Sequence, residues 1–69
     1  MQTEVFKVPG VSCEHCRRAI TESVQELPGI ARVDVDLAGK TVTVTYDPAA
    51  TGADRIRLAI EEAGYDVAS

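Results

Sequence analysis

Two alternating runs separated by only three residues constrain the fold more than any other feature of this sequence. Apolar and polar side chains alternate along residues 30–37 and again along residues 41–46. The apolar positions are Val33, Val35, Leu37, Val42, Val44 and Tyr46. Alternation with a period of two is typical of a strand with one buried face, and Ala38-Gly39-Lys40 leaves room only for a tight reversal. The sequence therefore predicts an antiparallel hairpin in the middle of the chain.

Two helical patterns flank this hairpin. The first has apolar residues at Cys16, Ile20, Val24 and Leu27, and Pro28-Gly29 ends it. Its expected N-cap is Ser12 or Cys13. The second covers residues 54–63, and Gly64 follows it at the position of a C-cap. The inner face of this second helix is expected to hold Ile56, Ala59, Ile60 and Ala63.

Short β-forming segments complete each half of the chain. Residues 3–8 read as a strand with Phe6 and Val8 inward, and residues 65–67 leave room for one more short strand. The order is then β-α-β-β-α-β. We expect residues 1–69 to form a single α+β domain of ferredoxin-like architecture, with a four-stranded antiparallel sheet and both helices on one of its faces.

The size and charge of the chain restrict its function. A domain of 69 residues has little room for a deep cleft, so we do not expect an enzyme. Its net charge of −4 disfavours binding to nucleic acid. No apolar run approaches the ~20 residues that span a bilayer, and the start does not resemble a secretory signal. We therefore expect a cytoplasmic protein that does not insert into membranes.

Both cysteines lie at the start of the first helix, as Cys13-Glu14-His15-Cys16. Free backbone amides and the helix dipole favour thiolates there, and Arg17 and Arg18 add positive charge. A lowered thiol pKa is expected for at least one cysteine. Cys16 continues the apolar stripe of the helix and on its own could be a core residue. Cys13 lies outside that stripe, which favours a function for the pair.

Two thiolates with few other ligands suit a soft ion of low coordination number. Thiolates select Cu(I), with Zn(II) as a competitor, but a structural zinc site needs four ligands. The chain has no second cysteine pair, and its only histidine is His15, which we expect to point into solvent. Cys13 and Cys16 are thus the predicted metal ligands. Such a site leaves one side of the ion open to the thiol of a partner.

The sequence resembles the heavy-metal-associated domain, above all bacterial copper chaperones and the N-terminal modules of copper-exporting P-type ATPases. The resemblance covers nearly the whole chain. It is carried by residues 10–16 (GVSCEHC), 27–30 (LPGI), 46–48 (YDP) and 59–65 (AIEEAGY). The family motif is Gly-Met-x-Cys-x-x-Cys, and Val11 stands here in place of its Met.

This resemblance implies that Cys13 and Cys16 bind Cu(I) and that Tyr65 lies close to them. It also implies a transfer by ligand exchange to the metal-binding domain of a copper-transporting P-type ATPase. Dimers bridged by Cu(I) occur in the bacterial group, and His15 would belong to the surroundings of the metal in such a dimer. The shorter Val11 puts the packing and mobility of the loop in question, although the two ligands are retained.

Other functions stay open at this point. The chain could be the metal-binding module of an ATPase studied on its own, and mercury suits any such thiol pair. A thiol-disulfide redox protein is a further alternative, although Glu-His rather than Gly-Pro separates the cysteines. The last is an adaptor whose thiols are inert.

Overall fold

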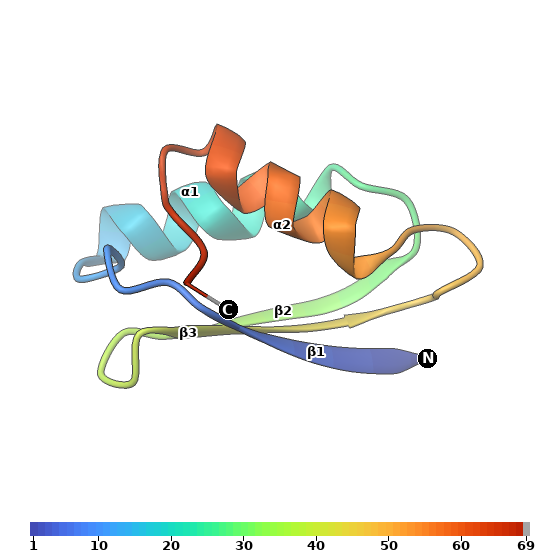
Figure 1. The fold of residues 1–69 in the computed structure, drawn as a ribbon, viewed down its shortest axis with the longest axis horizontal. Coiled ribbons are helices and arrows are strands. Elements are labelled where there is room, and N and C mark those ends of the chain that lie inside the picture. Colours follow the sequence, from blue (N-terminus) through green and yellow to red (C-terminus); the bar gives the residue numbers. More distant parts are fainter. Residues whose placement is uncertain (69) are drawn as a thin grey trace.

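The computed structural model describes residues 1–68, which form three strands and two helices (Figure 1). In chain order these are β1 (Gln2–Lys7), α1 (Glu14–Gln25), β2 (Ile30–Asp36), β3 (Thr41–Tyr46) and α2 (Ala53–Glu62). Each element lies within two residues of its predicted position. Both helices cover the same face of the sheet, as predicted. Neither described helix has the length and hydrophobicity needed to cross a membrane.

The predicted hairpin forms the middle and one edge of the sheet. The strand order is β1-β3-β2, and both pairings are antiparallel. The register places Val33 opposite Val44 and Val35 opposite Val42, so the apolar side chains of both strands share the face beneath the helices. Because β3 is central, its inward side chains are buried, whereas Val33 and Val35 on the edge strand are only half-buried.

The predicted fourth strand is wrong: the described residues form a three-stranded sheet. Within residues 65–68, a single backbone hydrogen bond reaches β1, from the amide of Ala68 to the carbonyl of Lys7 at 2.7 Å. The amide of Tyr65 is already bonded to Ile60 at the end of α2. Too few residues therefore remain after this helix cap to build a ladder.

A single apolar core joins the helices to the sheet. Its buried members are Phe6, Val8, Val11, Ile20, Val24, Val42, Val44, Tyr46, Ile56, Ala59 and Ile60. Phe6 and Val8 thus face inward, as predicted. Val8 and Val11 have no exposed surface, and the amide of Val11 donates to the carbonyl of Val8 at 3.1 Å. This turn fixes the loop that leads to Cys13.

The end of α2 is shaped by Gly64. Its φ of +99° lies in the left-handed region that glycine enters without strain. Gly64 donates its amide to the carbonyl of Glu61 at 3.0 Å, and Tyr65 donates to that of Ile60 at 3.3 Å. Together these bonds make a Schellman motif. It turns the chain back toward the start of α1 and so positions Tyr65.

Gly29 makes a similar turn at the opposite end of the molecule. Its φ is +78°, and a Cβ on Gly29 would lie 2.5 Å from the Cβ of Ala50. Only glycine fits there without displacing the neighbouring chain. The carbonyl of Gly29 accepts a hydrogen bond from the amide of Asp47 at 2.8 Å, which links the end of α1 to the connection before α2.

Candidate metal centre

The two cysteines lie at the junction between a fixed loop and the first turn of α1. Cys13 is the N-cap residue, with extended backbone (φ −150°), and its carbonyl accepts the first helical hydrogen bond, from Arg17, at 3.2 Å. Its thiol does not cap the helix. Cys13 is exposed, whereas Cys16 is half-buried and packs against the core. The predicted N-cap is correct in position, but the sulfur remains free for other chemistry.

The sulfurs of this pair converge. Sγ of Cys13 and Sγ of Cys16 are 3.1 Å apart, and both cysteines are free thiols. The predicted proximity of the two thiols is therefore confirmed. Since one sulfur faces solvent and the other closes the site from the core side, an ion bound by both would remain accessible from outside.

The Cys16 thiol is acidified, as expected for at least one cysteine. Hydrogen bonding from the hydroxyl of Tyr65, then from the backbone at Ser12 and from Cys13, lowers the pKa of Cys16 to about 7. The same contact with Cys16 raises the pKa of Tyr65. The predicted cause was incomplete: Tyr65 makes the largest contribution, whereas the expected contribution of Arg17 and Arg18 is not among the causes.

Replacing Tyr65 by Phe is expected to move the pKa of Cys16 up from about 7 toward the ordinary cysteine value of ~8.5. The Phe ring keeps the packing but removes the hydroxyl donor. The pH dependence of iodoacetamide labelling would measure this shift relative to the Cys13→Ser parent, in which a single thiol reacts and the contribution of the Cys13 thiol is absent from both proteins. Labelling at neutral pH should slow down, because the thiolate is the reactive form.

Tyr46→Phe in the same Cys13→Ser background provides the control, because the Tyr46 hydroxyl bonds to Gln2 instead. An equal labelling profile for the two Phe variants would contradict the assignment to Tyr65. The lowered pKa of Cys16 also makes the stability of the fold depend on pH. Since the folded pKa of Cys16 is below its unfolded value, the thiolate stabilises the fold fully above the unfolded pKa, and this contribution is lost as the pH falls through about 7.

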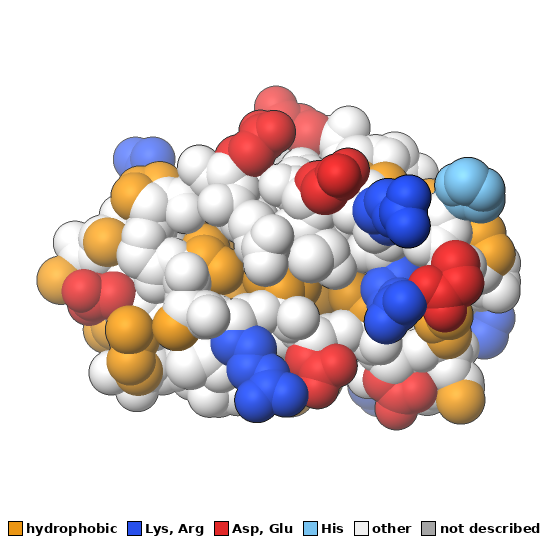
Figure 2. All heavy atoms as spheres, turned by 180° about the vertical axis from the view of Figure 1, so that it is seen from behind, with side chains coloured by type: hydrophobic (Ala, Val, Ile, Leu, Met, Phe, Trp, Pro, Cys, Tyr) orange, Lys and Arg blue, Asp and Glu red, His pale blue; other side chains and the backbone are white. Residues whose placement is uncertain are grey.

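His15 does not join the thiols. It is exposed, and the single histidine protrudes from the surface in Figure 2. Within residues 1–68, no three or more Cys, His, Asp and Glu side chains gather closely enough to hold a metal. The expectation that His15 points into solvent is confirmed. Within the described part of the chain, the two sulfurs lack a third protein ligand of these types.

The charged residues after the cysteines are solvated. Arg17 pairs with Glu14 through its Nε at 2.9 Å and a second guanidinium nitrogen, and both side chains are mostly exposed. An exposed pair of this kind contributes little to stability. Arg18 is exposed and makes no ion pair with the described residues within 4.0 Å.

Two contacts near the metal loop were not predicted from the sequence. A Cβ on Gly10 would touch Cδ1 of Tyr65 at 3.7 Å, so the tyrosine ring packs over the start of the loop. The amino group of Lys40, in the β2–β3 turn, donates to the carbonyl of Pro9 at 3.4 Å. Gly10 is the first residue of the motif, so its place in the loop was visible in the sequence. Lys40 and Pro9 are far apart in the sequence, so their contact was not.

The sequence is similar to a known protein family and to proteins that belong to it. The sequence model of the heavy-metal-associated domain matches residues 5–66. The copper chaperone CopZ of Staphylococcus haemolyticus is 39% identical over 67 residues, which cover 97% of this chain and 98% of that protein.

Solved structures show the same similarity. A structure described as CopZ metallochaperone superposes with a TM-score of 0.92 at 35% identity and covers 96% of this chain and 98% of its own. The water-soluble region of the P-type ATPase CopA from Bacillus subtilis superposes with a TM-score of 0.89 at 38% identity. That match covers 96% of this chain but 44% of the ATPase fragment, so the ATPase fragment contains further structure.

Proposed function

This chain belongs to the heavy-metal-associated domain family, and from that premise we propose that it carries Cu(I) on Cys13 and Cys16. The observation that supports this most is the convergence of two free sulfurs, 3.1 Å apart, at the surface. Thiolates are the ligands that Cu(I) prefers. The copper chaperones to which the chain is similar, at 39% identity over almost their full length, support the choice of metal.

Loading the proposed site requires the sulfurs to move apart. Metal–thiolate bonds are about 2.3 Å long for zinc, so two sulfurs on opposite sides of an ion of similar bond length lie about 4.6 Å apart. The observed separation is 3.1 Å. Cys13 lies in extended backbone before the helix, whereas Cys16 is within it, so we assign most of this movement to Cys13.

Release would follow by ligand exchange in the cytosol. A partner thiolate attacks the exposed side of the ion and forms a third metal–sulfur bond. One sulfur of this chain then leaves, and the second follows as the partner supplies its own second thiolate. The metal-binding domain of a P-type ATPase is the proposed acceptor, because an ATPase fragment contains a region similar to this chain. No oxidation or reduction occurs in this exchange, because each metal–sulfur bond that breaks is replaced by a bond to a thiolate of the partner.

A second candidate keeps this chemistry but changes the context. The chain is also similar to part of the B. subtilis CopA fragment at 38% identity, so it could serve as the metal-binding module of an ATPase. In that case the donor and acceptor roles would be exchanged. The genomic sequence that flanks the reading frame would distinguish the two, because an ATPase module is continuous with membrane-spanning segments.

An anaerobic titration of the fully reduced protein with Cu(I), against a chromogenic copper chelator, tests the proposed function. We expect withdrawal of copper from the chelator up to one ion per chain. A transition at half an ion per chain would instead indicate a homodimer bridged by Cu(I). Failure to compete with the chelator would refute copper carriage. Insulin reductase assays of the metal-free protein would then test the redox alternative.

A further inference from the structure

The two edges of the sheet differ in how they are closed. Along β1, the segment after Tyr65 covers part of the edge, with Ala68 bonded to Lys7 and Val67 packed against the core. The outer edge of β2 has no strand beside it within residues 1–68. It therefore presents unpaired backbone donors and acceptors at alternate residues of this seven-residue strand, to which another extended chain could add.

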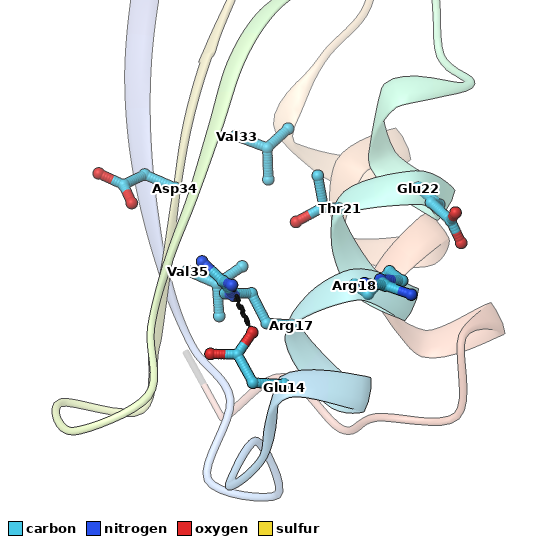
Figure 3. A pocket seen from close by; sticks show the side chains of 8 residues that line it. All are labelled: Glu14, Arg17, Arg18, Thr21, Glu22, Val33, Asp34 and Val35. Carbon is cyan, nitrogen blue, oxygen red and sulfur yellow. Dashed lines mark hydrogen bonds and ion pairs between the residues drawn. The ribbon is translucent and has the colours of Figure 1, made fainter.

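A groove runs beside this free edge, between β2 and α1. It has a volume of about 270 Å³ and is lined by Glu14, Arg17, Arg18, Thr21, Glu22, Val33, Asp34 and Val35. Figure 3 shows Val33 and Thr21 facing one another across it, while Arg17 reaches from α1 toward Val35. In Figure 2, hydrophobic atoms are visible between the two layers on this face. The half-buried Val33 and Val35 thus offer apolar contacts to side chains entering from the edge.

The other face of β2 is charged. Asp34 lies opposite Thr43 and Asp36 opposite Thr41, and the two carboxylates are exposed on the side of the strand that faces away from the helices. Asp34 borders the groove at the strand, but Figure 3 shows its carboxylate on the side of β2 opposite α1. Arg32 is the single basic residue of the strand. A strand added to β2 would therefore meet Val33 and Val35 on one face, in a groove bordered by charged side chains of α1. On the other face it would meet Asp34 and Asp36.

We propose that the free edge of β2 and the groove beneath α1 form a docking site for an extended segment of a partner protein in which apolar and basic side chains alternate. The partner backbone would pair with β2, its apolar side chains would enter the groove over Val33 and Val35, and its Lys or Arg side chains would face Asp34 and Asp36. This is recognition by strand addition. It does not involve the thiols and is independent of the proposed copper function.

The charge of the chain selects such a partner over a second copy. Each copy carries a net charge of −4, so two copies repel one another, whereas a basic segment is attracted to the protein. The edge is also short, at seven residues, with a register irregularity between Ile30 and Arg32. Such features oppose the pairing of identical edges.

Titration of the ¹⁵N-labelled, reduced protein with a capped peptide of alternating Val and Lys tests the proposal by NMR. We expect shifts confined to β2 and the facing side of α1, and slower hydrogen exchange of β2 amides. A peptide of the same composition, with its Val and Lys residues segregated, should bind at least about tenfold more weakly, since it cannot place apolar and basic side chains on opposite faces.

A matched pair of charge variants completes the test. The double variant Asp34→Lys/Asp36→Lys should weaken peptide binding at least about fivefold, because attractive ion pairs become repulsive. Glu61→Lys/Glu62→Lys makes the same change of net charge on the exposed end of α2 and should have no comparable effect. Equal weakening by both variants, shifts outside β2 and α1, or no binding at millimolar peptide would overturn the proposal. So would β2 shifts that depend on protein concentration without peptide, because they would identify a second copy as the occupant.

Discussion

The double variant Cys13→Ser/Cys16→Ser is expected to lose Cu(I) binding by at least two orders of magnitude. Removing groups that only orient metal ligands costs roughly 10–100-fold in affinity, so losing both ligands should cost more than ~100-fold. Serine hydroxyls are hard ligands that do not replace soft thiolates. The site offers no substitute within residues 1–68, where no cluster of three ligating side chains exists. The chromogenic competition titration measures the loss directly.

His15→Ala is the matched control for this experiment. It changes a potential ligand between the two cysteines, but the side chain is exposed and lies outside any ligand cluster among the described residues. We expect its affinity for Cu(I) to stay within a factor of about three of the unmodified protein. A loss as large in His15→Ala as in the double Ser variant would contradict the two-sulfur site. Unchanged binding by the Ser variant would refute it outright.

Ile60→Ala should be among the most destabilising single substitutions. Ile60 lies on α2, has no exposed surface and belongs to the core. Truncating a buried isoleucine to alanine costs about 2–5 kcal/mol, while a domain of this size is stable by only about 3–10 kcal/mol. We expect the free energy of unfolding to fall by ~3 kcal/mol. Urea denaturation of the reduced, metal-free protein, followed by circular dichroism, measures this value.

Leu58→Ala provides the comparison on the same helix. Leu58 is 56% exposed, and alanine has the higher helix propensity, so a change below about 0.5 kcal/mol is expected. A similar loss of stability in Leu58→Ala and Ile60→Ala would show that the position of α2 in the core is wrong. It would then also remove the physical basis for the placement of Tyr65.

The regular elements were predictable because each carries its own periodic signal. The alternation of Val33 and Val35 with charged residues defines which face of β2 is buried, and the stripe through Ile20 and Val24 does the same for α1. Residues 65–67 are too few to show a periodic pattern of this kind. Their pairing depended on where α2 ends, and the bond from Tyr65 to Ile60 uses the residue that would have started the strand. A three-residue segment cannot reveal this competition from its composition.

The metal site was predictable in part. The spacing of Cys13 and Cys16 at a helix start brings two thiols together through local geometry alone, and the structure confirms that proximity at 3.1 Å. Their role as ligands remains a prediction. The source of the acidity of Cys16 was not apparent from neighbouring residues, because it depends mainly on Tyr65, 49 positions further along the chain. The nearby Arg17 instead pairs with Glu14.

The Schellman motif at the end of α2 has a practical consequence for following the behaviour of this domain. Tyr65 is held by Gly64 and the carbonyl of Ile60, so its approach to Cys16 lasts only while the second helix stays docked. The reactivity of the Cys16 thiol, in the first half of the chain, therefore reports on the docking of α2 in the second half. Partial undocking of α2 would be detected at neutral pH as slower alkylation of Cys16, without any attached probe and before the protein unfolds globally.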